Sequence, residues 1–215
     1  PLVELLRGGA AVAAEAMSLE SVRLVLKTGL LDIPIDAADE LENYLLAHGL
    51  AGFETWHGSD WSFHRRDSLK KHGEAPATHE ADQLTRINAA RRCLLAYLDP
   101  WMEFALKAGG HTGAGWTAGI LEWLARLNAG RILSQWADDA EQDGRLDEAE
   151  EHRQVWREIM SFLDDLAFAF SDVTLTIHEF TDALEAGLSG LTLGLVPPTV
   201  DQVLVGSIER SRHPD

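Results

Sequence analysis

Apolar side chains recur every three or four residues along most of this chain, and no other feature of the sequence constrains the fold as strongly. This spacing gathers the apolar residues on one face of a helix, where they can be buried together. The pattern predicts helices over residues 2–16, 18–29, 36–49, 80–107, 117–127, 131–142, 146–166 and 176–187. We therefore expect a mainly α fold, in which Pro100 kinks or splits the helix that contains it.

Residues at the ends of these segments support the expected boundaries. Short polar side chains can accept a hydrogen bond from the free N–H groups of a first helical turn, and glycine commonly ends a helix. The expected first residues are Ser18, Asp36, Thr117 and Thr176, and the expected stops are Gly49, Gly144 and Gly187. Residues 50–79 show no sustained period, so we expect an ordered loop there.

The segment Val203–Ile208 is the one stretch whose β-branched residues predict a strand. A single strand is not stable by itself, so it must pair with another strand, and the sequence pattern predicts no second strand in this chain. The chain also begins with Pro1 rather than methionine. Both features favour a piece cut from a longer polypeptide.

The chain of 215 residues has a net charge of −17. Proteins that bind nucleic acid are basic on at least one face, because contacts to phosphates supply most of the non-specific affinity. The charge therefore excludes broad DNA binding and confines it to a basic island, residues 64–72, and to residues 207–213. In the island we single out Arg65, Arg66, Lys70 and Lys71.

Two tryptophans, Trp56 and Trp61, precede the basic island. Two interpretations stay open, because the rings could stack on nucleic-acid bases or could anchor a solvated loop in the core. For Trp123, Trp136 and Trp156 the helical spacing predicts burial. The acidic balance also leaves an alternative for the whole chain, a helical protein-interaction module that is unrelated to DNA and docks through its acidic hairpin.

The acidic stretch 139–150 also fits a twelve-residue calcium loop, with Asp139, Glu141, Asp143 and Glu150 at ligand positions and Gly144 at the turn. Acidic residues also favour helix N-termini, so a plain helical hairpin is the competing interpretation. We favour the hairpin.

Other motifs point to no chemistry. The glycine-rich stretch 109–115 has Trp116 where a phosphate-binding loop needs lysine, so we expect a turn. The histidines lack the spacing of a zinc site. The only cysteine, Cys93, lies among apolar residues, which favours a packing role over a reactive thiol and fits a reducing cytoplasm. No apolar run is free enough of charge to cross a membrane.

Three stretches resemble AddB-type subunits of the bacterial AddAB helicase–nucleases. They are "SLESVRLVLKTGLLDIPIDAADELENYLLAHGLAG" at 18–52, which includes Lys27 and Thr28, "LEAGLSGLTLGLVPP" at 184–198 and "VPPTVDQVLVGSIERSRHPD" at 196–215. The resemblance implies a superfamily-one helicase-like fold, with residues 1–34 and 184–215 in a RecA-like lobe and 35–183 as an inserted helical subdomain. It places Ser207, Arg210 and Arg212 where related helicases hold a motif near DNA and nucleotide.

The resemblance also implies a parent protein with ATP, magnesium and an iron–sulfur cluster, acting on DNA with an AddA-type subunit in double-strand break resection and recombinational repair. None of the motifs for these groups occurs in the chain, which has neither a Walker lysine motif nor cluster cysteines. We therefore expect no catalytic residue, metal or cofactor in this segment. Its expected role is that of a scaffold or DNA guide.

Overall fold

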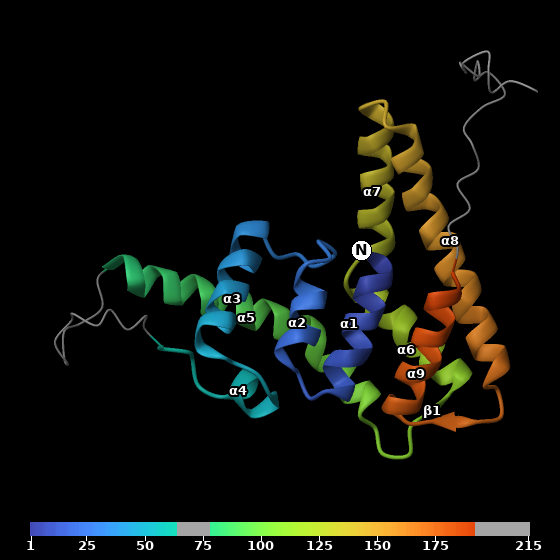
Figure 1. Cartoon of the computed structure of the whole chain (residues 1–215), viewed down its shortest axis with the longest axis horizontal. Coiled ribbons are helices and arrows are strands. Elements are labelled where there is room, and N and C mark those ends of the chain that lie inside the picture. Colours follow the sequence, from blue (N-terminus) through green and yellow to red (C-terminus); the bar gives the residue numbers. More distant parts are fainter. Residues whose placement is uncertain (64–77, 192–215) are drawn as a thin grey trace, which may run out of the picture.

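Helices make up nearly all of the regular structure in residues 1–63 and 78–191, which are the residues that the computed structural model describes (Figure 1). The helices are α1 (Leu2–Ala14), α2 (Leu19–Leu26), α3 (Ile35–His48), α4 (Phe53–His57), α5 (Thr78–Ala105), α6 (Gly113–Arg126), α7 (Ala129–Gln142), α8 (Leu146–Ala169) and α9 (Ile177–Gly190). The expectation of a mainly α fold is confirmed. The predicted strand Val203–Ile208 lies outside the described residues.

Several helix ends follow the capping rules that the sequence suggested. The Ser18 hydroxyl accepts a hydrogen bond from Ser21 N at 3.1 Å and begins α2. Thr176 and Glu179 form a reciprocal capping box at the start of α9. Gly49 ends α3 in the left-handed conformation, with φ 61°.

Three predicted boundaries were wrong. Asp36 lies inside the first turn of α3, because Pro34 with its fixed φ already takes the N-cap position. Thr112 rather than Thr117 begins α6; Thr117 is buried, and its hydroxyl donates to Leu163 O at 2.9 Å. Gly187 lies inside α9 and does not end it. Glycine is needed there because the Phe162 ring occupies the space that a side chain would fill.

Two elements escaped the sequence pattern because they are very short. The first is α4, which lies within the expected loop. The second is an antiparallel pair of two-residue strands, β1 (His111–Thr112) and β2 (Thr174–Leu175), which joins the α5–α6 turn to the α8–α9 turn. Gly110 allows this pairing, because a Cβ atom there would lie 2.0 Å from Leu175 O.

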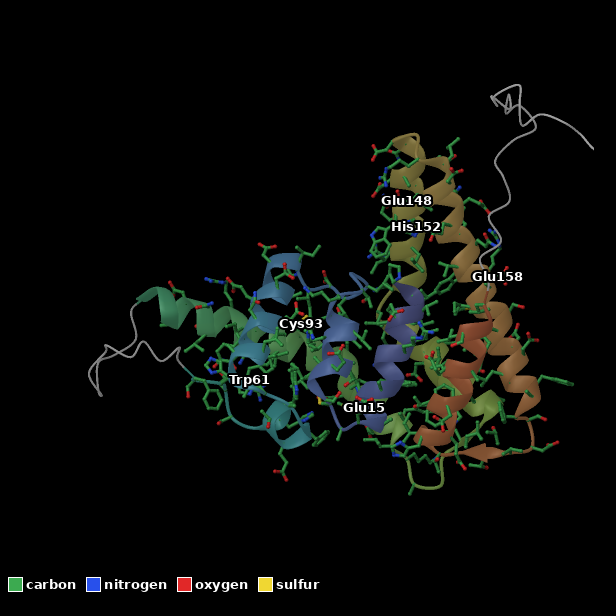
Figure 2. The ribbon with its side chains drawn as sticks, viewed as in Figure 1. Glu15, Trp61, Cys93, Glu148, His152 and Glu158 are labelled. Atoms are coloured by element: carbon green, nitrogen blue, oxygen red, sulfur yellow. The ribbon has the colours of Figure 1, made fainter. Side chains whose placement is uncertain are left out.

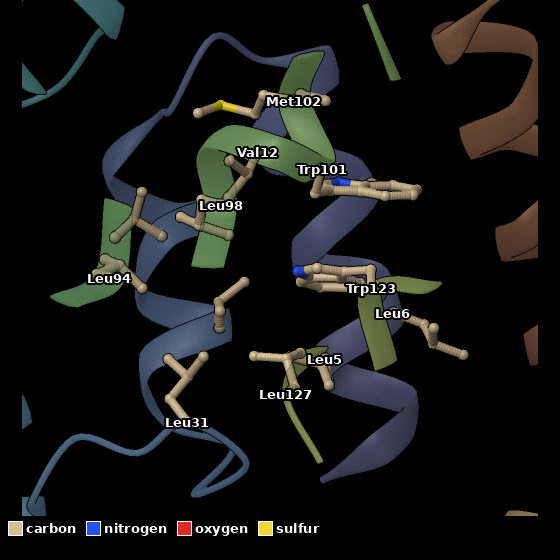
Figure 3. Close-up of a cluster of buried hydrophobic side chains, with 14 of the residues drawn as sticks. Leu5, Leu6, Val12, Leu31, Leu94, Leu98, Trp101, Met102, Trp123 and Leu127 are labelled. Atoms are coloured by element: carbon tan, nitrogen blue, oxygen red, sulfur yellow. The ribbon is translucent and has the colours of Figure 1, made fainter. Parts of the chain in front are cut away.

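A cluster of buried hydrophobic side chains, which includes two tryptophan rings, joins α1, α5 and α6 (Figure 3). The rings of Trp101 and Trp123 stack with their centroids 5.1 Å apart, and Trp101 Nε1 donates to Gly9 O at 2.7 Å. Burial on both sides of Pro100, at Leu98 and Trp101, holds α5 as one helix through the proline. The structure therefore excludes the predicted split.

Helices α7 and α8 form an antiparallel hairpin that projects from the rest of the molecule (Figure 1). Burial of Trp123 is confirmed, whereas Trp136 and Trp156 are only partly buried. Both still pack against the core, so the prediction holds in part. Their burial is incomplete because a pair of helices covers only one face of each. None of the described helices has a long enough apolar stretch to cross a membrane.

Replacement of Gly9 by alanine tests the close packing of α1 on the tryptophan pair. The new Cβ would lie 2.3 Å from Trp123 Cη2, so we expect Gly9→Ala to lower the free energy of unfolding by about 1–3 kcal/mol. Gly190→Ala is the control, because a Cβ at this helical glycine meets nothing within 4 Å. Equal urea midpoints for the two variants would contradict this packing.

Candidate nucleic-acid interface

The residues predicted to contact DNA all lie outside the described residues. They are Arg65, Arg66, Lys70, Lys71, Ser207, Arg210 and Arg212. The structure does describe how the chain is held immediately before the basic island, up to Phe63. This anchor is formed by Tyr44 of α3 and by Asn88 and Arg91 of α5, and we refer to these three side chains as the anchor residues.

The first two anchor residues fix the backbone by paired hydrogen bonds. The Asn88 side chain accepts from Trp61 N at 2.8 Å and donates to Trp61 O at 2.9 Å. Two residues later, the Tyr44 hydroxyl accepts from Phe63 N at 2.9 Å and donates to Phe63 O at 3.0 Å. Each side chain thus satisfies both backbone groups of one residue, as a neighbouring strand would.

The third anchor residue, Arg91, is 3% exposed and is surrounded by carbonyl oxygens. Its guanidinium donates to Trp56 O, Gly58 O and Ser59 O at 2.5–2.9 Å. These carbonyls lie at and just beyond the end of α4, where helical carbonyls lack partners within the helix. Burial lowers the pKa of Arg91, but a guanidinium keeps its charge in proteins.

The tryptophans before the basic island belong to this anchor and not to a base-stacking surface. Trp56 is 0% and Trp61 5% exposed. The Arg91 guanidinium lies 4.6 Å from the centroid of the Trp61 ring, which also stacks on Tyr44. Trp61 lies on the side of the molecule formed by α3, α4 and the first half of α5 (Figure 2). The anchoring interpretation is confirmed, and base stacking by these two rings is excluded.

The described part of the chain is strongly acidic. Six of the 18 lysine and arginine residues and five of the 35 acidic residues lie outside it, which leaves 12 basic and 30 acidic residues. Ion pairs with described carboxylates occupy nine of these 12: Arg7, Arg23, Lys27, Arg86, Arg92, Arg126, Arg145, Arg153 and Arg157. This surface therefore offers little to bind phosphates.

An ion-pair network connects residues of the stretch 18–52, which was one of the three stretches that resemble AddB-type subunits. Glu42 of α3 accepts from Lys27 Nζ at 2.5 Å and from Arg23 Nε at 2.8 Å, both near the end of α2. The bond from Lys27 is the largest cause that lowers the pKa of Glu42, whose side chain is only 10% exposed. Thr28 is buried and donates to Val25 O at 2.8 Å. These residues join α2 to α3.

The structure excludes the calcium-loop interpretation of 139–150, and the hairpin interpretation is confirmed. Asp139 and Glu141 lie within α7, and Glu150 lies within α8, so their carboxylates do not surround one point. Glu141 pairs with Arg153 and Glu150 with Arg157. Gly144, with φ 75°, forms the turn.

The remaining candidates from the sequence are a histidine metal site, the glycine-rich stretch 109–115 and Cys93. Among the described side chains, those of 1–63 and 81–191, no three from histidine, cysteine or acidic residues lie close enough together to hold a metal. The glycine-rich stretch 109–115 forms the turn before α6, as predicted, with β1 inside it. Cys93 is partly buried, and this burial is the main cause that raises the pKa of its thiol. A smaller fraction of this thiol is therefore in the reactive thiolate form at neutral pH.

Sequence reasoning missed the anchor residues. Asn88 and Arg91 are polar but lie beside Ile87, Ala90 and Leu94 on the buried face of α5. A polar pair three residues apart on an apolar face was the available signal, since buried polar groups need partners. Their partners lie about thirty residues away and are backbone atoms, which no local pattern identifies.

Comparisons with known proteins relate the whole chain to the B-type subunit of the ATP-dependent helicase/deoxyribonuclease. All of the chain aligns with that subunit from Desulforamulus reducens, with 36% identity over 215 residues, and covers 18% of it. The same subunit from Desulforudis audaxviator is 38% identical over 221 residues and that from Geobacillus thermodenitrificans 36% over 222, each covered to 19%. No family model matches the chain. The suspected relationship to AddB-type subunits is confirmed as homology. The chain matches a region that makes up 18% of the B-type subunit from Desulforamulus reducens.

Replacement of Arg91 by lysine tests the anchor. A lysine keeps the charge but cannot reach three carbonyls in the same plane, so we expect the free energy of unfolding to fall by about 3 kcal/mol. The matched control is Arg92→Lys, because Arg92 is exposed and its one ion pair within the described part of the chain is with Asp60. That change should cost less than about 1 kcal/mol. Equal losses in chemical denaturation would count against the anchor.

Replacement of Glu42 by glutamine tests the network between α2 and α3. Because the pKa of Glu42 is lowered in the folded protein, its carboxylate stabilises the fold above the unfolded pKa of about 4.3. This stabilisation is lost as the pH falls through the lower folded pKa. Glu42→Gln should therefore cost about 2 kcal/mol at pH 7 and progressively less below about pH 4.

Glu20→Gln is the control for this network, because Glu20 is exposed and, among the residues that the structure describes, pairs with Arg23 alone. We expect it to change stability by less than about 1 kcal/mol at any pH. A cost of Glu42→Gln that stayed constant from pH 7 to pH 3 would refute the role of its charge.

Proposed function

We propose that this chain is a non-catalytic helical part of an AddB-type subunit and presents a short basic segment to DNA. Its full length is homologous to about 18% of the B-type subunit of the ATP-dependent helicase/deoxyribonuclease. The chain thus spans less than a fifth of the relatives it matches. The activity of the whole subunit is therefore part of the proposal.

The relatives are subunits of an ATP-dependent helicase/deoxyribonuclease, which supports this activity for the whole protein to which the chain would belong. We propose that it works with an AddA-type subunit in double-strand break resection and recombinational repair, and that ATP, magnesium and an iron–sulfur cluster bind elsewhere in it. Residues 1–34 and 184–215 would belong to a RecA-like lobe, and residues 35–183 would form a helical insertion. The chain itself then acts as a scaffold.

The proposed role as a DNA guide is based on the anchor residues. They fix the backbone at Trp61 and Phe63, and Arg65 follows Phe63 by two residues. A basic segment that leaves a fixed point loses less freedom when it binds a ligand than one on a free chain. The acidic described surface would repel DNA elsewhere, so that contacts concentrate on Arg65, Arg66, Lys70 and Lys71, with Ser207, Arg210 and Arg212 as a second group.

Replacement of the four island cations by glutamine tests this function. The variant Arg65→Gln/Arg66→Gln/Lys70→Gln/Lys71→Gln should weaken the binding of single-stranded DNA by the subunit, because it removes up to four contacts to phosphates. Each such contact contributes about 0.7 to the magnitude of the slope of log K against log salt. The slope should fall by up to about 3. Fluorescence anisotropy over a range of salt concentrations measures it.

The matched control replaces four arginines of α6 and the hairpin by glutamine: Arg126, Arg145, Arg153 and Arg157. Both variants change the net charge of the chain from −17 to −21. Only the island variant should lose affinity. Equal losses would mean that total charge decides binding, and unchanged affinity of the island variant would remove the DNA role.

A second candidate function is a protein-interaction module. One observation favours it. The α7–α8 hairpin projects from the rest of the molecule (Figure 1), is acidic, and exposes Leu146, the first residue of α8, to 58%. A basic protein partner would fit this surface. This function predicts that Leu146→Ser abolishes copurification of a partner subunit and leaves DNA binding unchanged.

A further inference from the structure

The backbone before the basic island holds an exposed aromatic ring, that of Phe63. This residue is 50% exposed, whereas Trp56 and Trp61 are buried. The Tyr44 hydroxyl fixes both backbone groups of Phe63, because it accepts from Phe63 N at 2.9 Å and donates to Phe63 O at 3.0 Å. A single exposed apolar side chain is common on protein surfaces, but one whose backbone is fixed in this way keeps its position. Phe63 therefore presents an aromatic surface at a defined place.

Phe63 is also the outer end of a row of aromatic rings. Successive centroids lie 4.5–5.8 Å apart, in the order Trp56, Trp61, Tyr44, His48 and Phe63. The first three residues are 0%, 5% and 8% exposed, so the row runs from the core to the surface. In the last step the His48 and Phe63 rings stack, with 29° between their planes. His48 thus supports the Phe63 ring, and the exposed part of that ring can stack on another flat group.

The charge that follows this ring differs from that of the rest of the chain. Residues 64–72 contain four lysines and arginines and one acidic residue, whereas the described part contains 12 basic and 30 acidic residues. Arg65 follows Phe63 by two residues, which span at most about 7 Å of chain. Proteins bind single-stranded nucleic acid by combining cations for the phosphates with aromatic rings for the bases. A nucleotide would use both groups, whereas an apolar protein segment would use the ring and leave the cations unpaired.

We propose that the Phe63 ring stacks on an unpaired base of single-stranded DNA, with His48 as its support. This inference rests on the proposed function, in which the basic island binds the phosphates, and it adds a contact to a base. Every base has a flat face, so the contact tolerates any sequence. A base within a duplex is already stacked on its neighbours and costs energy to remove, so the ring favours single strands over double strands.

Replacement of Phe63 by leucine tests the stacking. The variant keeps an apolar side chain and the backbone hydrogen bonds to Tyr44, but it lacks the flat ring. The affinity of the whole subunit for a fluorescently labelled oligothymidylate, measured by anisotropy, should fall at least about fivefold. The slope of log K against log salt should stay the same, because Phe63 contacts no phosphate in this proposal. Phe63→Trp keeps a flat ring and should bind at least as tightly as the unmodified subunit.

Phe53→Leu is the matched control in the protein. Phe53 is 47% exposed and its ring stacks on His57 with the centroids 4.0 Å apart, so it shares the exposure and the histidine support of Phe63. The groove beside it is lined by Asp99 and Glu103 and by no lysine or arginine of the described chain, which disfavours a phosphate there. This variant should leave the affinity for oligothymidylate unchanged.

Two changes of the ligand separate the base from the phosphates. An oligomer of abasic sites with the same length keeps the phosphates and lacks the bases. Phe63→Leu should not change its affinity, nor the affinity for double-stranded DNA. Equal urea midpoints of the variants and the unmodified subunit establish that the fold is intact.

Four results would overturn the proposal. They are an unchanged affinity of Phe63→Leu for oligothymidylate, an equal loss with the abasic oligomer, an equal loss in Phe53→Leu, and an equal loss in Phe63→Trp. If the glutamine variant of the island lowers the salt slope while Phe63→Leu binds normally, stacking fails and the proposed function stands. If the island variant also binds normally, both fail.

Discussion

The burial of one positive charge, that of Arg91, is the constraint on which the order of the backbone before the basic island depends. No carboxylate bonds to its guanidinium among the described residues; carbonyls at and beyond the end of α4 surround it instead. A buried charge is costly unless its hydrogen bonds are satisfied, so the 56–59 backbone must stay in place for the fold to remain stable. Asn88 and Tyr44 extend this order to Phe63.

Much of the fold could be predicted because the signals for a helix lie in residues that are close together in the sequence. The period of the apolar residues and the caps at Ser18 and Thr176 depend on neighbours within four residues. The β1–β2 pair and the anchor could not be predicted in this way. Their partners lie far apart in the sequence, such as His111 and Leu175, and pairing over two residues leaves no period to detect.

Charge divides the surface of the chain between two kinds of interaction. The described residues are acidic, and most of their cations are already paired, as Lys27 is with Glu42. In the proposed function, contacts to DNA phosphates would therefore be confined to the basic residues of 64–72 and 207–213, whereas the acidic α7–α8 hairpin would suit a basic protein partner.

Amide hydrogen exchange of the unmodified chain tests the central claim most directly, because it measures whether the backbone is held before the basic island. The amides of Trp61 and Phe63 donate to Asn88 Oδ1 and Tyr44 Oη. We predict that both exchange at least ~100-fold more slowly than an unstructured peptide. Exchange of these two amides at the unstructured rate, while the amides of α5 stay protected, would contradict the account.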